Sequence, residues 1–147
     1  MTDLVVNRRA LFDYEILERL EAGIELLGFE VKAIRTGHVS LQGSFVTVRG
    51  HELWLTNADV PPYQVGNTPA NYTSDRPRRL LLHREEIASL IGKIKHSGLT
   101  LIPLRLYSKK RQIKVELGLG RSKKKHDKRE TIRRRDMARE VRRTLER

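Results

Sequence analysis

The sequence contains no cysteine. That absence excludes disulfide bonds and thiolate metal sites, and it is consistent with a reducing cytosol. No run approaches about 18 consecutive apolar residues, so we expect no membrane-spanning helix. Residues 1–10 are largely polar and no apolar segment follows them, so we expect no secretory signal peptide. Together these absences favour a soluble cytoplasmic protein.

Sequence signatures of catalysis and metal binding are also missing. No HExxH, G-x-S-x-G, P-loop or G-x-G-x-x-G motif occurs. The histidines form no cluster with the spacing of metal ligands. They are His38, His51, His83, His96 and His126. We therefore expect a protein that is not an enzyme and that uses no cofactor or metal.

Positive charge is abundant and unevenly placed. The chain has 30 basic and 18 acidic residues, a formal net charge of +12. Residues 121–147 alone hold 13 basic and 5 acidic residues, a net +8, with only four residues from Ile, Leu, Val and Met. A merely solubilising tail is the alternative, but charge so concentrated favours a polyanion such as nucleic acid.

This C-terminal segment has little apolar surface with which to pack. Its apolar residues Ile132, Met137, Val141 and Leu145 form only a thin helical stripe among arginines. Isolated helices of this length are marginal in water, and the like charges of residues 133–135 oppose helix formation. We predict that residues 121–147 are disordered alone and become helical when a polyanion neutralises them.

The first part of the body alternates between strand and helix patterns. Apolar residues recur at every second position over residues 14–26, which predicts a long strand, with a helix as the competing interpretation. Residues 28–37 have no strict alternation and predict one or two helical turns closed by Gly37. Residues 45–48 and 53–55 predict a hairpin.

The second part of the body contains a long loop, a helix and two strands. Residues 61–77 hold four of the five prolines and predict a loop. Apolar residues from Ile87 to Ile94 follow helical spacing, and Gly98 is expected to end that helix. Residues 99–107 and 112–120 alternate as strands, with a basic hairpin loop between them.

These elements predict a mainly β protein. Five or six strands with at least two helices and short connections favour an antiparallel sheet. Alternation along the strands indicates one buried face, which a small closed or partly closed barrel would cover. An open antiparallel sheet with helices on one face is the alternative.

The body also has features that suit RNA. Basic residues cluster at Arg8–Arg9 and over residues 76–84 and 109–111, where they can hold phosphates, and aromatic residues can stack unpaired bases. No helix-turn-helix, zinc-finger or basic-zipper pattern occurs, which favours RNA over DNA. Glu30 stands between two apolar residues, so it either accepts from a base edge or pairs with Lys32 or Arg35.

Several stretches occur together in a specific order. They are NRRALFDYEILERLEAGIELLGFEVKAIRTG, PYQVGN, RRLLLHREEI, LTLIPLRLY, KVELGLG and KKKHDKRETIRRRD. This ordered set resembles the SsrA-binding protein (small protein B) family over residues 7–136. This chain departs from the family pattern at three positions. Tyr72 stands where a His is expected, Ser122 stands where a Gly is expected, and Met137 stands where an aromatic residue is common.

The resemblance implies a fold and a function. It implies a small antiparallel β-barrel of OB-like topology with two or three short helices, in an RNA-binding domain over residues 1–120 and a basic tail over residues 121–147. It implies a monomer that binds the tRNA-like domain of tmRNA and delivers it to stalled ribosomes for trans-translation. The tail would occupy the decoding region and the empty mRNA channel.

The resemblance also assigns residues by position. The RNA-binding residues of the body are expected to be Asn7, Arg8, Arg9, Glu30, Lys32, Arg35, Arg78, Arg79 and His83. The ribosome-binding residues of the tail are expected to be Lys123, Lys124, Asp127, Lys128, Arg129, Arg133 and Arg134.

Two other functions are consistent with a basic RNA-binding chain. An integral ribosomal protein, or another rRNA-binding protein, would be present on essentially every ribosome, whereas a rescue factor would be present on few. An RNA-processing enzyme would show turnover with RNA substrates.

Overall fold

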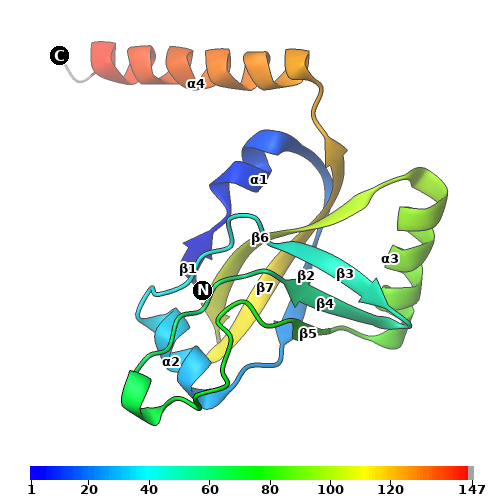
Figure 1. Ribbon diagram of the computed structural model, residues 1–147. Helices are drawn as coiled ribbons and strands as arrows, with labels where there is room; N and C mark the ends of the chain where they lie inside the picture. Colours follow the sequence, from blue (N-terminus) through cyan, green and yellow to red (C-terminus); the bar gives the residue numbers. More distant parts are fainter. Residues whose placement is uncertain (146–147) are drawn as a thin grey trace.

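A computed structural model describes residues 1–145, including the side chains of all of these except residues 125–127 and 144. Figure 1 shows a curved sheet with helices around it and one long helix above it. The elements, in chain order, are β1 (Thr2–Val6), α1 (Arg8–Asp13), β2 (Tyr14–Ile24), α2 (Gly28–Arg35), β3 (Phe45–Arg49), β4 (Glu52–Thr56), the 3-10 helix η1 (Val65–Asn67), β5 (Arg78–Leu81), α3 (Arg84–Ser97), β6 (Thr100–Lys109), β7 (Gln112–Ser122) and α4 (Lys125–Leu145).

All seven strands belong to one antiparallel sheet in the order β1-β6-β7-β2-β5-β4-β3. The mainly β, OB-like fold class predicted from the sequence is confirmed. The sheet curves, but within residues 1–145 no ladder pairs its two outermost strands, so the barrel is open.

Most of the predicted elements are confirmed. The alternating segment forms β2, and its register against β7 shifts between Ile16 and Glu18, where the strand bends. The helix with apolar spacing forms α3, and Gly98 ends it at φ 63°. Gly37, at φ 86°, follows α2. These elements carry strong local signals, because periodicity and a left-handed terminal glycine both depend on neighbouring residues only.

The core packs strands of the sheet against α2 and α3. Its buried residues include Leu53 and Leu55 of β4, Leu80 of β5 and Leu117 of β7, each at most 2% exposed. Ile34 of α2 packs into the same cluster. Burying each such side chain contributes about 1.5–3 kcal/mol. This packing fixes α2 against the sheet and leaves its polar face in solvent.

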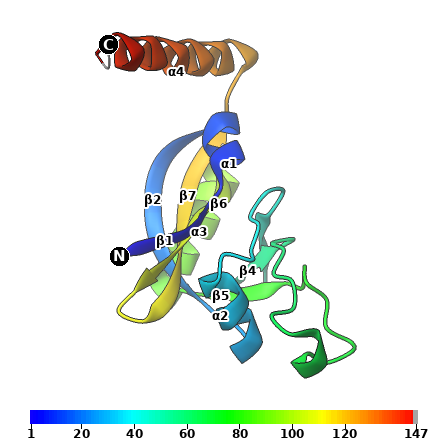
Figure 2. The same ribbon diagram turned by 90° about the vertical axis from the view of Figure 1, so that its left-hand side faces the viewer.

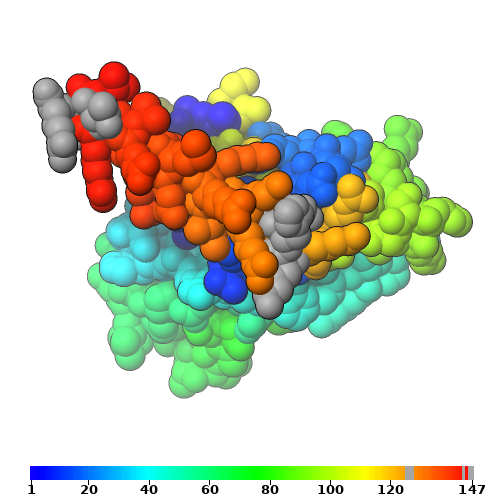
Figure 3. All heavy atoms as spheres, turned by 90° about the horizontal axis from the view of Figure 1, so that it is seen from above, coloured from blue at the N-terminus to red at the C-terminus, as the bar shows by residue number. Residues whose placement is uncertain are grey.

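The molecule has two distinct ends. In Figures 1 and 2, α4 lies beyond α1 at one end, while α2 and the loop of residues 61–77 lie at the other. Figure 3, viewed from above, shows α4 crossing the body as a separate rod. Within the described residues, no helix combines the length and the apolar character needed to cross a membrane.

Candidate RNA-binding site

Asn7 is a structural cap at the start of α1. Its side-chain amide donates to the carbonyl of Pro103 at 2.9 Å, and its Oδ1 accepts from the amide of Ala10 at 3.3 Å. The side chain is buried, whereas Arg8 and Arg9 immediately after it are exposed. Asn7 therefore fixes the start of α1, from which the side chains of Arg8 and Arg9 project into solvent, and it is not itself available to a large ligand.

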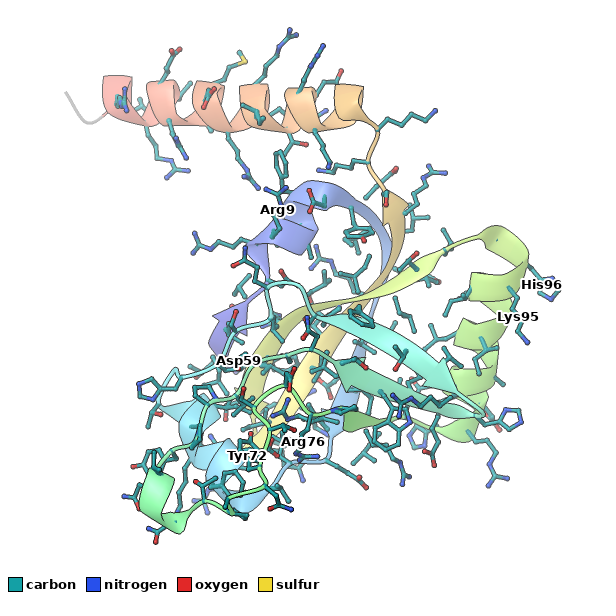
Figure 4. All side chains as sticks on the ribbon, viewed as in Figure 1. Arg9, Asp59, Tyr72, Arg76, Lys95 and His96 are labelled. Carbon is teal, nitrogen blue, oxygen red and sulfur yellow. The ribbon has the colours of Figure 1, made fainter. Side chains whose placement is uncertain are left out.

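Phe12 of α1 is surrounded by cations from two elements. Arg9, Lys128 and Arg135 lie 5.4, 5.8 and 5.7 Å from the ring centroid. Lys128 also pairs with Asp13 at 3.2 Å, and that pairing together with Arg9 holds the pKa of Asp13 below its usual range despite the opposing effect of burial. This cluster joins the first half of α4 to α1, and Figure 4 shows Arg9 on the side that faces α4.

A groove of about 520 Å³ opens beside this cluster. Val39, Leu41 and Val6 supply apolar walls, and Arg8, Arg9 and Arg135 supply positive charge. Cations from both the body and α4 therefore face one hollow, an arrangement that suits a polyanion backbone.

Glu30 lies inside the protein. Its side chain has no exposed surface, and it accepts from Arg78 Nε at 2.7 Å and from Arg76 Nε at 3.2 Å. Its Oε1 also accepts from the amide of Leu27 at 2.8 Å, which caps α2. The partners are thus Arg76 and Arg78, and not Lys32 or Arg35 as the sequence suggested. Direct contact with a base edge is incompatible with this burial.

Tyr72 completes the Glu30 cluster. Its hydroxyl oxygen lies 3.0 Å from Glu30 Oε2 and 2.8 Å from the carbonyl oxygen of Val60, either of which can accept its single hydrogen, while Arg78 donates to it at 3.1 Å. Its ring meets Phe29 edge-on at 4.8 Å between centroids. The residue that departs from the family pattern is therefore half-buried and connects Glu30, Arg78 and the Pro-rich loop, and Figure 4 shows it beside Arg76.

This network shifts the pKa values of Glu30 and Tyr72, and it also holds the Pro-rich loop of residues 61–77 in position. Burial opposes charge on Glu30, but hydrogen bonds from Arg76 and Leu27 and the charge of Arg78 hold the pKa of Glu30 below its usual value. Burial and the Glu30 carboxylate raise the pKa of Tyr72. Arg78 also donates to the carbonyls of Ala58 and Ser74, both at 2.9 Å, so it ties down the two ends of the Pro-rich loop.

The remaining predicted body residues lie at the surface. Lys32 and Arg35 are exposed on α2, and His83 is exposed at the start of α3. Arg79 is half-buried on β5 and lies 3.7 Å from Glu25 and 4.0 Å from Glu52. The structure thus brings Lys32 and Arg35 together on one helix, but it does not bring them to Arg8 and Arg9 at the opposite end.

The predicted tail residues begin where β7 ends at Ser122. The amide of Lys123 donates to the carbonyl of Asp13 at 2.8 Å, and its Nζ donates to Thr131 at 2.9 Å. Lys124 and Arg129 are exposed, as are Arg133 and Arg134 on α4. The side chain of Asp127 lies outside the described residues.

Sequence reasoning did not single out two residues of these clusters. They are Arg76 and Arg135. Both stood only within basic runs, and nothing in the local pattern distinguishes an arginine that contacts the body from one that faces solvent. In the described part of the chain, no group of three His, Cys, Asp or Glu residues is placed to hold a metal ion.

Comparisons with known proteins agree with this geometry. The family model described as SmpB protein matches residues 4–147. The SsrA-binding protein of Synechococcus elongatus is 54% identical over 141 residues, covering 96% of this chain and 92% of the relative. The SsrA-binding protein of Carboxydothermus hydrogenoformans is 51% identical over 139 residues, covering 95% and 93%.

A solved structure is similar as well. One chain of the structure described as "tmRNA-SmpB: a journey to the center of the bacterial ribosome" is 46% identical, with a TM-score of 0.67, over 88% of this chain and 94% of that chain. The resemblance noted from the ordered motifs is confirmed by sequence and by fold. This chain belongs to the SmpB family.

Proposed function

We propose that this protein binds the tRNA-like domain of tmRNA and delivers it to stalled ribosomes for trans-translation. The observation that carries the proposal is the 54% identity with an SsrA-binding protein over 96% of the chain. The similar chain from a tmRNA-SmpB structure of the bacterial ribosome supports the same partners. The site of action is the cytoplasm, where ribosomes are stalled, and the protein acts by binding and not by catalysis.

In the body, the exposed cations contact RNA and the buried polar residues position them. Arg8 and Arg9, with Lys32 and Arg35 on α2, are exposed and hold phosphates. Asn7, Glu30 and Arg78 act from beneath the surface, because each is at most 5% exposed. Arg79 and His83 extend the basic surface along β5 and the start of α3.

The tail acts at the ribosome, in the decoding region and the empty mRNA channel. Lys128 and Arg135 join α4 to α1, and the turns beyond them project away from the body (Figure 1). Those turns carry dense like charge and a thin apolar stripe, so they are marginal alone and gain stability when rRNA phosphates neutralise them. Body and tail divide at the end of β7.

The experiment that tests the function is recovery of RNA with the full-length protein from bacterial cells. The proposal predicts one dominant RNA that combines a tRNA-like fold with a short open reading frame, on a small fraction of ribosomes. Recovery of rRNA alone, with one copy of the protein on every ribosome, would instead show an integral ribosomal protein.

A further inference from the structure

A second groove lies at the end of the molecule opposite α4. It has a volume of about 410 Å³ and opens between α2, the end of β2, β5 and the β6–β7 turn. Small-ligand sites usually measure about 300–1,000 Å³, so one nucleobase fits easily.

The floor of this groove is apolar and open to solvent. Ile24, Leu26 and Val31 lie on one side, and Ile113 lies on the other. Leu81 is 42% exposed, although it stands in a strand whose neighbour Leu80 is fully buried. Exposed apolar patches often mark binding sites, and this aliphatic floor could contact the flat face of a ligand.

The rim of the groove is cationic. Arg35, Arg111 and Lys114 line it, and no carboxylate does. The guanidinium of Arg35 is held in place, since it donates to Ser108 Oγ at 3.1 Å and to the carbonyl of Arg111 at 2.7 Å. Among the described ion pairs, none uses Arg35, Arg111 or Lys114. Lys114 interacts with the carboxylate of Glu21 outside the groove, so the charge that remains available for an anionic ligand is mainly that of Arg35 and Arg111.

The turn that carries the rim has an unusual backbone. Lys110 and Arg111 hold positive φ angles of 49° and 65°. Hairpin turns with two positive φ angles strongly prefer Asn and Gly, because a side chain in that conformation costs free energy. In this turn both positions are basic, Lys110 and Arg111, although backbone conformation alone would favour Asn or Gly there.

From these features we propose that the groove receives one unpaired nucleobase of the bound RNA. The base lies on the aliphatic floor beside Leu81, and its flanking phosphates lie on Arg35, Arg111 and Lys114. The inference rests on the proposed function and adds a subsite to it. An unpaired base is required because bases in an RNA helix are stacked and their faces are inaccessible, whereas loop bases can be splayed outward. Apolar side chains and a guanidinium plane are suitable partners for such a base.

The test measures affinity of the full-length protein for the tRNA-like domain, intact and with single unpaired nucleotides replaced by abasic ones. Wild type is expected to lose about tenfold in affinity at one position, within the usual range for a stacked base. In Leu81→Ser the intact RNA binds about tenfold more weakly, and the abasic replacement at that position then has no further effect. Arg111→Gln weakens binding to intact and abasic RNA by the same factor, because it contacts phosphate.

Matched controls separate the groove from general effects. Leu17→Ser removes another exposed leucine, 47% exposed on β2, and Lys95→Gln removes a cation at the far end of α3, where Figure 4 shows it projecting outward. Both are expected to bind RNA like wild type. Thermal unfolding of Leu81→Ser confirms that the exposed substitution leaves the fold intact, and Arg111→Gln provides a second, independent probe.

Two outcomes would overturn the inference while the proposed function stands. If the loss of binding free energy caused by Leu81→Ser adds to the loss caused by the abasic replacement at every nucleotide tested, no base occupies the groove. If the groove variants bind the tRNA-like domain normally but fail to associate with ribosomes, the groove contacts the ribosome and not a base of the tRNA-like domain. Failure of wild type to bind the intact tRNA-like domain is a different result, and it would overturn the proposed function as well.

Discussion

Glu30 is a buried acid whose charge is balanced by two arginines. Its side chain and that of Arg78 have no exposed surface, while Arg76 is 28% exposed. Removing one member of a buried ion pair is strongly destabilising, because the other charge stays buried without its partner. The pair also holds the Pro-rich loop through the bonds of Arg78 to Ala58 and Ser74. Glu30 therefore determines local stability more than it contacts a ligand.

We expect Glu30→Gln to lower the free energy of unfolding by about 3–5 kcal/mol, because Arg78 loses its buried counter-charge. Denaturant unfolding measures this change. Glu18→Gln is the matched control: its partner Lys93 lies 2.9 Å away, but both side chains are exposed, and such pairs contribute about 0–1 kcal/mol. Equal losses in the two variants would show that burial does not strengthen the Glu30 contacts.

The same carboxylate makes stability depend on pH. The pKa of Glu30 is lower in the folded protein than the unfolded value of about 4.3, so its contribution is complete above that value and disappears as the pH falls through the folded pKa. We predict that the stability difference between wild type and Glu30→Gln is constant from about pH 6 to 8 and shrinks below about pH 4. A difference that stays constant in acid would argue against an ionised Glu30.

At this scale the sequence predicts residue types better than residue surroundings. The motif match marks Asn7, Glu30 and Arg78, yet all three are buried. Arg76 and Arg78 follow Glu30 by more than forty positions, and only the sheet brings them together. The residues next to Glu30 in the sequence cannot reveal a partner so far along the chain. The exposure of Lys32 and Arg35, by contrast, follows from their positions on the polar face of α2.

The pairing of β2 with β7 depends on one close backbone approach. A Cβ atom added at Gly120 would lie 2.1 Å from the carbonyl oxygen of Glu15. This contact adjoins the register shift between Ile16 and Glu18. The strand that ends at Ser122 can run beside β2 only because residue 120 has no side chain. The position therefore also determines where the tail leaves the body.

We expect Gly120→Ala to destabilise the protein by about 3 kcal/mol or more, since backbone must move to admit the methyl group. Gly28→Ala is the control, because nothing lies within 4 Å of its added Cβ and alanine favours a helix start over glycine. Calorimetric melting of the two variants gives the comparison. A Gly120→Ala protein as stable as Gly28→Ala would contradict the close approach.

Helix α4 contacts the body through few residues. Lys128 and Arg135 face Phe12, and the later turns extend outward (Figure 2). We predict that residues 132–145 are only partly helical in the free protein and become fully helical on RNA, because phosphates relieve the repulsion among arginines. Backbone chemical shifts with and without the tRNA-like domain or ribosomal RNA report this. Full helicity in the free protein at physiological salt would be the contrary result.

The elements missed by sequence reasoning are short or dependent on distant partners. Strand β1 has five residues and pairs only with β6, about a hundred positions away. Helix α1 has six residues, and its cap, Asn7, is held in place by a hydrogen bond to the distant carbonyl of Pro103. Longer elements with their own periodicity, such as β2 and α3, were predicted correctly. The degree of closure stayed open between a closed barrel, a partly closed barrel and an open sheet, because alternation indicates a buried face but does not show which strands pair at the edges.

Over the whole molecule, basic residues occur both on the body and on α4, and the two sets are given different functions. The basic surface of α2 and the groove beside it lie at one end, and α4 lies at the other (Figure 1). Arg8 and Arg9 lie at the α4 end but belong to the body, so the two functions divide at the end of β7 and not midway between the two ends of the molecule. The arrangement suits a body that binds tmRNA and a tail that enters the ribosome.

The most direct test compares the full chain with one truncated after Ser122, which retains all seven strands. Affinity for tmRNA and tagging of stalled nascent chains are measured in parallel. The account predicts that the truncated protein binds tmRNA nearly as tightly as the full chain but supports no tagging. Parallel loss of binding and tagging, or tagging that survives without the tail, would contradict the division between body and tail.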